Sequence, residues 1–190
     1  MIKDDTKKIE LNLLAREIRG CTKCRLWESR FFAVPGEGSH RAKIMLVGEG
    51  PGSQEDKNGL PFVGKAGQIL NDLLLSIDLR RKDIFITNIV KCHPPKNRNP
   101  KPDEIEICTS NYLLNQIDLI NPRIIVALGL IPSQFFFSEI KRMKDVHGQL
   151  RQKKNKSFLL LYHPIMAIYR PGLIPIMKAD FIKIKKLMLV

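Results

Sequence analysis

Four short runs of apolar residues divide the chain, and each leads into a segment with helical character. The runs cover residues 43–47, 84–88, 124–128 and 157–162. Continuous apolar runs, unlike alternating ones, are typical of strands buried on both faces between helices. Helical spacing or a helix-opening proline predicts helices at 11–18, 64–77, 102 to about 119, 132–137 and 174 to about 188. The pattern predicts a three-layer α/β/α fold with a central, mainly parallel four-stranded sheet.

A chain of 190 residues suits one compact domain, which we expect to span residues 1–190. Its longest apolar runs fall well short of the ~20 residues that cross a membrane. The N-terminus passes from charged residues directly into an amphipathic segment, without the apolar stretch of a secretory signal. We expect a monomer with no membrane partner that is intracellular, in the cytoplasm with the chromosome.

The charge balance points to nucleic acid. The chain has 32 lysines and arginines against 19 acidic residues, a formal net charge of +13. A generally basic proteome is the alternative explanation, but the basic residues are concentrated. Residues 141–156 hold seven basic residues and one acidic residue, and residues 91–101 hold four basic residues and no acidic one. Such clusters attract polyanions and suit contacts with a phosphate backbone.

The distinctive polar motifs lie just after the predicted strands, where open parallel sheets bind their ligands. After the first strand comes Gly48-Glu49-Gly50-Pro51-Gly52, whose bare amides suit close approach to a phosphate or a base edge. The loop lacks the Walker Gly-Lys-Ser/Thr and the Gly-x-Gly-x-x-Gly pattern, which argues against nucleoside triphosphates and dinucleotides. A tight surface turn is the alternative, and it leaves the acidic residues of this loop unexplained.

Four cysteines have the spacing of a shared metal site: Cys21-x2-Cys24, then Cys92-x15-Cys108. A close pair with two distant partners is a usual way to build such a site. Disulfides are rare in a cytosolic protein, and separate core thiols would not explain a Cys-x2-Cys in a polar setting. The spacing alone leaves an iron–sulfur cluster and structural zinc equally open.

The motifs together resemble a known family. Gly48-Glu49-Gly50-Pro51-Gly52, Glu55-Asp56, the segment from Gly59-Leu60-Pro61-Phe62 to Gly67, the segment from Thr87-Asn88 to Pro95, and His163-Pro164 follow one another as in the family four uracil-DNA glycosylases of bacteria and archaea. The resemblance covers the chain from about Cys21 to Arg170. It implies a glycosylase that flips uracil out of DNA, hydrolyses the N-glycosidic bond and leaves an abasic site, and it implies a [4Fe-4S] cluster on Cys21, Cys24, Cys92 and Cys108.

The resemblance also implies roles for residues that carry only weak signals alone. Phe62 would stack on the base, although a core aromatic is the ordinary explanation. Asn88, otherwise a common turn former, would hydrogen-bond O4 and N3–H of uracil and refuse cytosine. His163, otherwise most often structural, would bond O2 while negative charge develops on the departing base.

The remaining site residues come from the loop after the first strand. The resemblance implies that Glu55 fills the space beside uracil C5 and excludes the methyl group of thymine, and we place Gly48 and Gly50 among the substrate-binding residues. Glu49 is our prediction for the carboxylate nearest the sugar, where it would stabilise the transition state or orient water. Other uracil glycosylases have an aspartate where this chain has Gly50, so the water-activating group is not defined.

The chain departs from the family after His163-Pro164, where Ile165 replaces the usual serine and removes a phosphate contact. Met166, Ile168 or Tyr169 would then wedge into the duplex, and residues 141–156 would contact its backbone. Gly50 argues against a related covalent uracil-binding glycosylase, which has glutamine there. A non-catalytic iron–sulfur DNA-binding module and a zinc-dependent nucleic-acid binder remain alternatives. No clear sliding-clamp motif is present, and the sequence does not indicate whether single- or double-stranded DNA is preferred.

Overall fold

A computed structural model describes residues 2–153 and 155–188 of the chain. Its centre is one sheet of six strands in the order β1-β3-β2-β4-β6-β5. The four inner strands are parallel: β2 (Ile44–Gly48), β3 (Phe85–Asn88), β4 (Ile124–Leu128) and β6 (Lys156–Leu161). Every residue of β2, β3 and β4 is buried, as their unbroken apolar runs predict.

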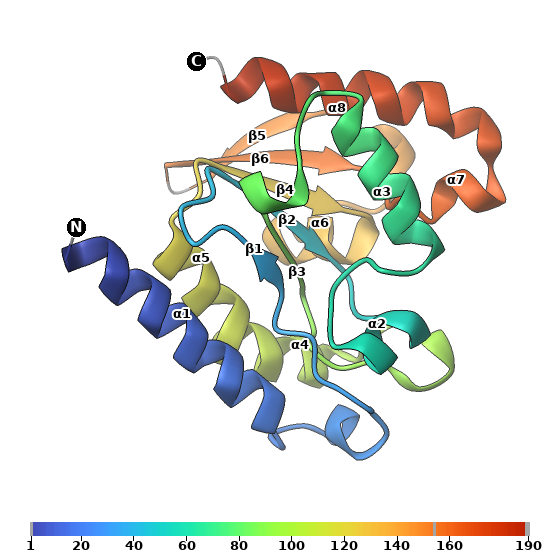
Figure 1. Cartoon of the computed structure of the whole chain (residues 1–190). Coiled ribbons are helices and arrows are strands. Elements are labelled where there is room, and N and C mark those ends of the chain that lie inside the picture. Colours follow the sequence, from blue (N-terminus) through green and yellow to red (C-terminus); the bar gives the residue numbers. More distant parts are fainter. Residues whose placement is uncertain (1, 154, 189–190) are drawn as a thin grey trace.

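Helices cover both faces of the sheet, and the sheet separates the core into two clusters (Figure 1). One face carries α1 (Ile2–Gly20), α4 (Pro102–Cys108), α5 (Leu114–Ile120) and α6 (Leu130–Phe136). The other carries α3 (Lys65–Leu75) and α8 (Ile174–Met188). The three-layer α/β/α prediction is confirmed.

The predicted number of strands was wrong, because two antiparallel edge strands extend the parallel core. The first, β1 (Glu37–Gly38), is only two residues long and pairs with β3. The second, β5 (Leu150–Lys153), pairs with β6 and is largely exposed. Edge strands are often short or charged, and such sequences give no apolar run to detect.

Several short elements also escaped prediction. They are α2 (Ser53–Asn58), α7 (Met166–Tyr169) and the 3₁₀ turns η1 (Arg25–Glu28), η2 (Arg81–Asp83), η3 (Pro95–Asn97), η5 (Met143–Asp145) and η6 (Pro171–Leu173). The helix predicted from residue 102 contains a π-helical turn, η4 (Thr109–Leu113), directly after Cys108. None of the helices within residues 2–153 and 155–188 has the length and apolar character needed to span a membrane.

Candidate active site

The carboxyl ends of the parallel strands bring the predicted base-binding residues together. Gly48 ends β2 and is paired in register with Asn88, which ends β3. A methyl group added at Gly48 would come within 2.3 Å of Asn88 Oδ1 and 2.8 Å of Phe62 Cζ. Only glycine therefore lets the carboxamide and the aromatic ring meet at this point of the sheet.

The side chain of Asn88 has unused hydrogen-bonding capacity. Asn88 is only 1% exposed, and its Oδ1 is a buried acceptor with no hydrogen-bond partner among the described residues. An unsatisfied buried acceptor costs about 1–3 kcal/mol. Such a group is expected where a ligand supplies the missing donor.

His163 follows β6 and reaches the same place. Its ring stacks on Phe62 with centroids 5.6 Å apart. The Cβ of His163 packs against Gly129, which has a φ of 102° and where an added Cβ would lie 3.1 Å from it. The amide of Ile165 donates to Nδ1 at 3.2 Å, which leaves the ring proton on Nε2. Burial lowers the pKa of His163 to about 4, and the carboxylate of Glu55 opposes the shift only in part. The ring is therefore a neutral donor at neutral pH.

Phe62 is held in an uncommon backbone conformation, with a φ of 51°. Arg81 of η2 binds the carbonyl oxygens of Phe62 through Nη1 at 3.2 Å and of Pro61 through Nη2 at 2.5 Å. The carbonyl of Phe62 also lies so close to Gly67 that a Cβ there would be 1.8 Å from it. The guanidinium and this glycine together fix the ring that faces Asn88.

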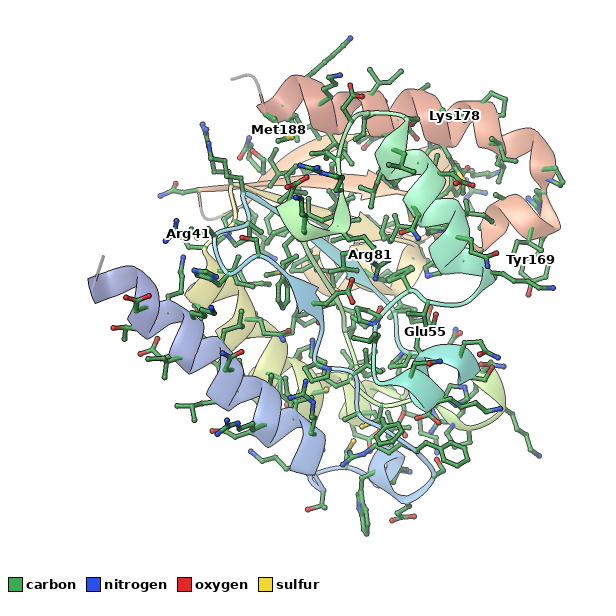
Figure 2. The ribbon with its side chains drawn as sticks, in the orientation of Figure 1. Arg41, Glu55, Arg81, Tyr169, Lys178 and Met188 are labelled. Carbon is green, nitrogen blue, oxygen red and sulfur yellow. The ribbon has the colours of Figure 1, made fainter. Side chains whose placement is uncertain are left out.

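Glu55, labelled in Figure 2, joins the two motif loops beside the place where Gly48, Asn88, Phe62 and His163 meet, which we call the base pocket. Its carboxylate accepts hydrogen bonds from the amides of Gly52 at 3.1 Å, Val63 at 2.8 Å and Gly64 at 2.8 Å. The side chain is almost completely buried. The carboxylate oxygens of Glu55 therefore bind the two loops. Exclusion of the methyl group of thymine, the role predicted for this residue, would depend on the fixed position of its side chain.

Glu49, which directly follows Gly48, is an acidic residue without a partner among the described residues. Its carboxylate makes no hydrogen bond or ion pair with the residues that the structure describes, and burial raises its pKa above 4.5. An aspartate would not fit at position 50 of this chain, because a Cβ on Gly50 would lie 2.9 Å from Val90 Cγ2. A larger residue at position 50 would have to displace Val90.

The four cysteines converge on one cavity, which Lys91, three residues after Asn88, also lines. Cys21 and Cys24 follow α1, Cys92 follows β3 and Cys108 ends α4. All four are free, and they line the same cavity together with Arg30, Lys91, Tyr112 and neighbouring apolar side chains. Within the described part of the chain, no three histidine, cysteine or acidic side chains form a group that could hold a metal ion as arranged.

Burial and nearby hydrogen-bond donors act in opposite directions on the ionisation of the cysteine thiols. Burial raises the pKa of Cys24, Cys92 and Cys108, the last to about 12, so binding a metal would have to displace their protons. Nitrogen donors are already directed at three of the four sulfurs. They are Arg30 Nη1 to Cys92 at 3.1 Å, the Lys91 amide to Cys108 at 3.3 Å and the Lys23 amide to Cys21 at 3.5 Å.

Comparison with known proteins agrees with this arrangement. The family model of the uracil DNA glycosylase superfamily matches residues 35–186. A type-4 uracil-DNA glycosylase of Sulfurisphaera tokodaii is 45% identical over 186 residues, covering 93% of this chain and 84% of that protein. One of Archaeoglobus fulgidus is 43% identical, covering 93% of this chain and 92% of that protein. The chain belongs to the type-4 uracil-DNA glycosylases.

A type-5 uracil-DNA glycosylase of Thermus thermophilus is more distant, at 33% identity over 60% of this chain and 58% of that protein. The long, nearly complete match is therefore with type-4 members. The Cys-x2-Cys pair at Cys21 and Cys24 lies before the segment matched by the superfamily model but within the chain length that the type-4 relatives cover.

Only part of the basic segment 141–156 lies where the predicted DNA contacts could form. His147 stacks on Tyr162, which precedes His163, so the start of the segment lies at the pocket end of the sheet. Lys153 pairs with Lys156 at the opposite end of β6, and both are used in contacts within the protein. Lys154 lies outside the described residues. Arg142 is paired with Asp145 and Arg151 with Glu139. The prediction therefore narrows to the exposed lysines Lys141 and Lys144.

The second basic segment, 91–101, also needs correction. Lys91 is 1% exposed, and Arg98 forms a two-point ion pair with Glu104. Lys96 and Lys101 remain as its exposed lysines. Charge counting could not separate buried from exposed cations, because burial depends on the tertiary fold.

The three predicted wedge residues differ in exposure. Met166 packs against the core. Ile168 is 39% exposed and Tyr169 is 73% exposed, and Tyr169 projects at the outer edge of the molecule (Figure 2). The structure thus leaves Ile168 and Tyr169 available for the predicted wedge.

Sequence reasoning missed two residues that support the pocket. Arg81 precedes β3 in a polar segment with no motif of its own, and its two carbonyl contacts are formed only in the tertiary structure. Lys91 lies inside a motif, but the sequence distinguishes it only as one of the basic residues of the segment 91–101.

Proposed function

We propose that this chain removes uracil from DNA by hydrolysing the N-glycosidic bond, as a monofunctional uracil-DNA glycosylase. The observation that carries the proposal is the buried, unpartnered Oδ1 of Asn88 beside Phe62 and His163. Membership in the type-4 family supports the same reaction. The product is an abasic site, the first intermediate of base excision repair.

Recognition begins with a flipped nucleotide. Extruding the base costs a few kcal/mol, and stacking on an aromatic ring returns about 1–3 kcal/mol. Phe62 provides that ring. Asn88 Oδ1 accepts the N3–H of uracil, and its amide nitrogen donates to O4, a pattern that cytosine cannot satisfy. Glu55 keeps the wall of the pocket fixed, and we propose that this wall excludes the methyl group of thymine.

Bond cleavage requires stabilising the uracil anion. The neutral His163 donates its Nε2 proton as a hydrogen bond to O2 while negative charge develops there. A histidine with a pKa of about 4 is not a general acid at neutral pH, so the hydrogen bond stabilises the anion without transferring the proton. Glu49, with a free carboxylate, orients water toward the sugar and stabilises its positive charge.

We also propose that Cys21, Cys24, Cys92 and Cys108 hold a [4Fe-4S] cluster. Their common cavity, the donors directed at three sulfurs and the buried cation of Lys91 fit such an anionic group. When bound, the cluster supplies a four-point link between α1, the segment after β3 and the end of α4. We place the hydrolysis of the N-glycosidic bond at Asn88, His163 and Glu49 and not at the cluster.

The substrate partner is uracil-containing DNA, single- or double-stranded. The net charge of +13 supports this partner, and steep salt dependence of binding is expected. A monomer acting without a membrane partner, in the cytoplasm with the chromosome, is part of the proposal. A sliding-clamp partner finds no support in a motif.

Alkaline cleavage of uracil-containing oligonucleotides tests the function. Single-stranded DNA and duplexes with uracil opposite adenine or guanine are treated with wild type and with Asn88→Ala, His163→Ala and Glu49→Ala. We expect alkali-labile sites with wild type and much slower formation with each variant. Folded wild type that produces none contradicts the enzyme and supports the non-catalytic DNA-binding alternative; full activity in all three variants contradicts the site.

A further inference from the structure

Lys91 has an unusual position between the base pocket and the cysteines. It is 1% exposed, among the largest fully buried side chains of the protein. Its ammonium donates to three oxygens: Thr87 Oγ1 at 2.6 Å, the Asn88 carbonyl at 2.7 Å and Gln116 Oε1 at 2.7 Å. A buried ammonium is costly unless its donors are used, and here all three have acceptors.

The network around this ammonium is anchored on several elements. Gln116 of α5 donates through Nε2 to the carbonyl of Pro35 at 2.6 Å. The hydroxyl of Thr87 donates to the same carbonyl at 3.1 Å. Both side chains therefore have a second partner, which fixes the two acceptors that hold Lys91 in place.

The third acceptor belongs to the base pocket. Lys91 binds the backbone carbonyl of Asn88, the residue with the unpartnered Oδ1. The two amides that follow Asn88 bind the loop after β2: Ile89 donates to the Gly48 carbonyl at 2.9 Å, and Val90 donates to the Glu49 carbonyl at 3.1 Å. The backbone at Asn88 is thus held from both sides.

The same lysine borders the cysteine site. Its amide donates to Cys108 Sγ at 3.3 Å, it precedes Cys92 in sequence, and it lines the cavity of the four cysteines. Its carbonyl accepts the amide of Val34 at 2.7 Å. One residue therefore contacts both a sulfur atom of the cysteine site and the strand end that carries Asn88.

We propose that Lys91 is a positioning residue that fixes Asn88 for base recognition and connects the cysteine site to the pocket. The inference rests on the proposed function. Lys91 does not touch the substrate; it acts by holding the Asn88 carbonyl, so that the carboxamide is already oriented when uracil arrives. Pre-organised supporting contacts of this kind increase the rate of the chemical step.

The test is a double-mutant cycle between Lys91 and Asn88, measured as single-turnover uracil release. Lys91→Met keeps an apolar stem of similar length and removes the ammonium. In the wild-type background we expect a loss of about tenfold or more in the rate of release. In the Asn88→Ala background the same change is expected to alter the rate by less than about twofold, because the carboxamide it orients is absent.

Two further readouts separate positioning from general damage. Iron content per chain and visible absorption of Lys91→Met should match wild type, and KM should change little because phosphate contacts dominate it. Gln116→Met is the matched control: it removes one of the three acceptors of the ammonium, while Thr87 and the Asn88 carbonyl still hold Lys91. We expect its rate of uracil release to stay within about threefold of wild type.

Lys91→Gln is run through the same cycle as a second variant, in case Lys91→Met does not fold. Glutamine keeps an N–H donor in a shorter, neutral side chain. We expect a smaller loss, again only when Asn88 is present. Equal losses in both backgrounds, an equal loss in Gln116→Met, or failure of both Lys91 variants to fold would overturn the inference. Wild type that releases no uracil would instead contradict the proposed function.

Discussion

The amide of Ile165 donates a hydrogen bond to Nδ1 of His163 across 3.2 Å, so the neutral ring carries its proton on Nε2. The residue that takes the place of the family's usual serine thus still serves the site through its backbone. Because the pKa of His163 is lowered to about 4, the imidazole stays neutral across the ordinary working range of pH. The ionisation that limits activity in acid must then come from another group.

Glu49 is expected to set the acid limb of the pH profile. Burial raises its pKa above 4.5, so as the pH falls the carboxylate is protonated earlier than an ordinary glutamate, and kcat/KM decreases while His163 is still neutral. Glu49→Gln should lower kcat about 100-fold or more and flatten this limb. His163→Ala should be slow but keep the limb. A wild-type limb in Glu49→Gln would contradict the assignment.

Gly48→Ala should close the base pocket. The new methyl group would overlap Asn88 Oδ1 and the Phe62 ring, so both must move from the place where the base binds. Forced shifts of this kind cost about 1–3 kcal/mol, and we expect uracil release to fall by at least about tenfold. Gly172→Ala is the control, because a Cβ there meets nothing within 4 Å. Normal activity in Gly48→Ala would show that the base binds elsewhere.

Arg81→Lys should release Phe62 from its conformation. Lysine cannot donate in parallel to the two carbonyls that the guanidinium binds, and a residue with a positive φ is strained by about 1–3 kcal/mol. The expected results are a lower Tm and slower excision with a nearly unchanged affinity for undamaged DNA. Arg80→Lys, at an exposed ion pair, should behave as wild type. The idea fails if both variants excise uracil equally fast.

Removing one sulfur ligand should destabilise the protein. Cys92→Ser is expected to lose iron and visible absorption and to lower both Tm and activity, because the proposed cluster would link three separate segments of the chain. Ser110→Ala, an exposed position near Cys108, is the control. Bound zinc without iron in anaerobically purified wild type would contradict the cluster and favour the zinc alternative.

The sequence was sufficient for the parallel core and for the meeting of Asn88 and His163, because strand ends in a parallel sheet gather at one edge. Phe62 lies in a loop, and only the family resemblance placed it beside them. The sequence could not show that the carboxylate of Glu55 accepts hydrogen bonds from three backbone amides, or that the side chain of Val90 fills the space beside Gly50. Those facts depend on how loops from different strands pack. The roles of Arg81 and Lys91 were hidden for the same reason, since a cation's partner is a property of the fold.

Chromatographic release of free base from otherwise identical duplexes that carry uracil, thymine or cytosine opposite guanine tests whether Asn88 selects uracil for removal. The account predicts that wild type releases uracil and neither of the other bases, and that Asn88→Ala slows this release by about tenfold or more because the hydrogen bonds to N3–H and O4 are lost. Release of no base by folded wild type, or unchanged release by Asn88→Ala, would contradict it.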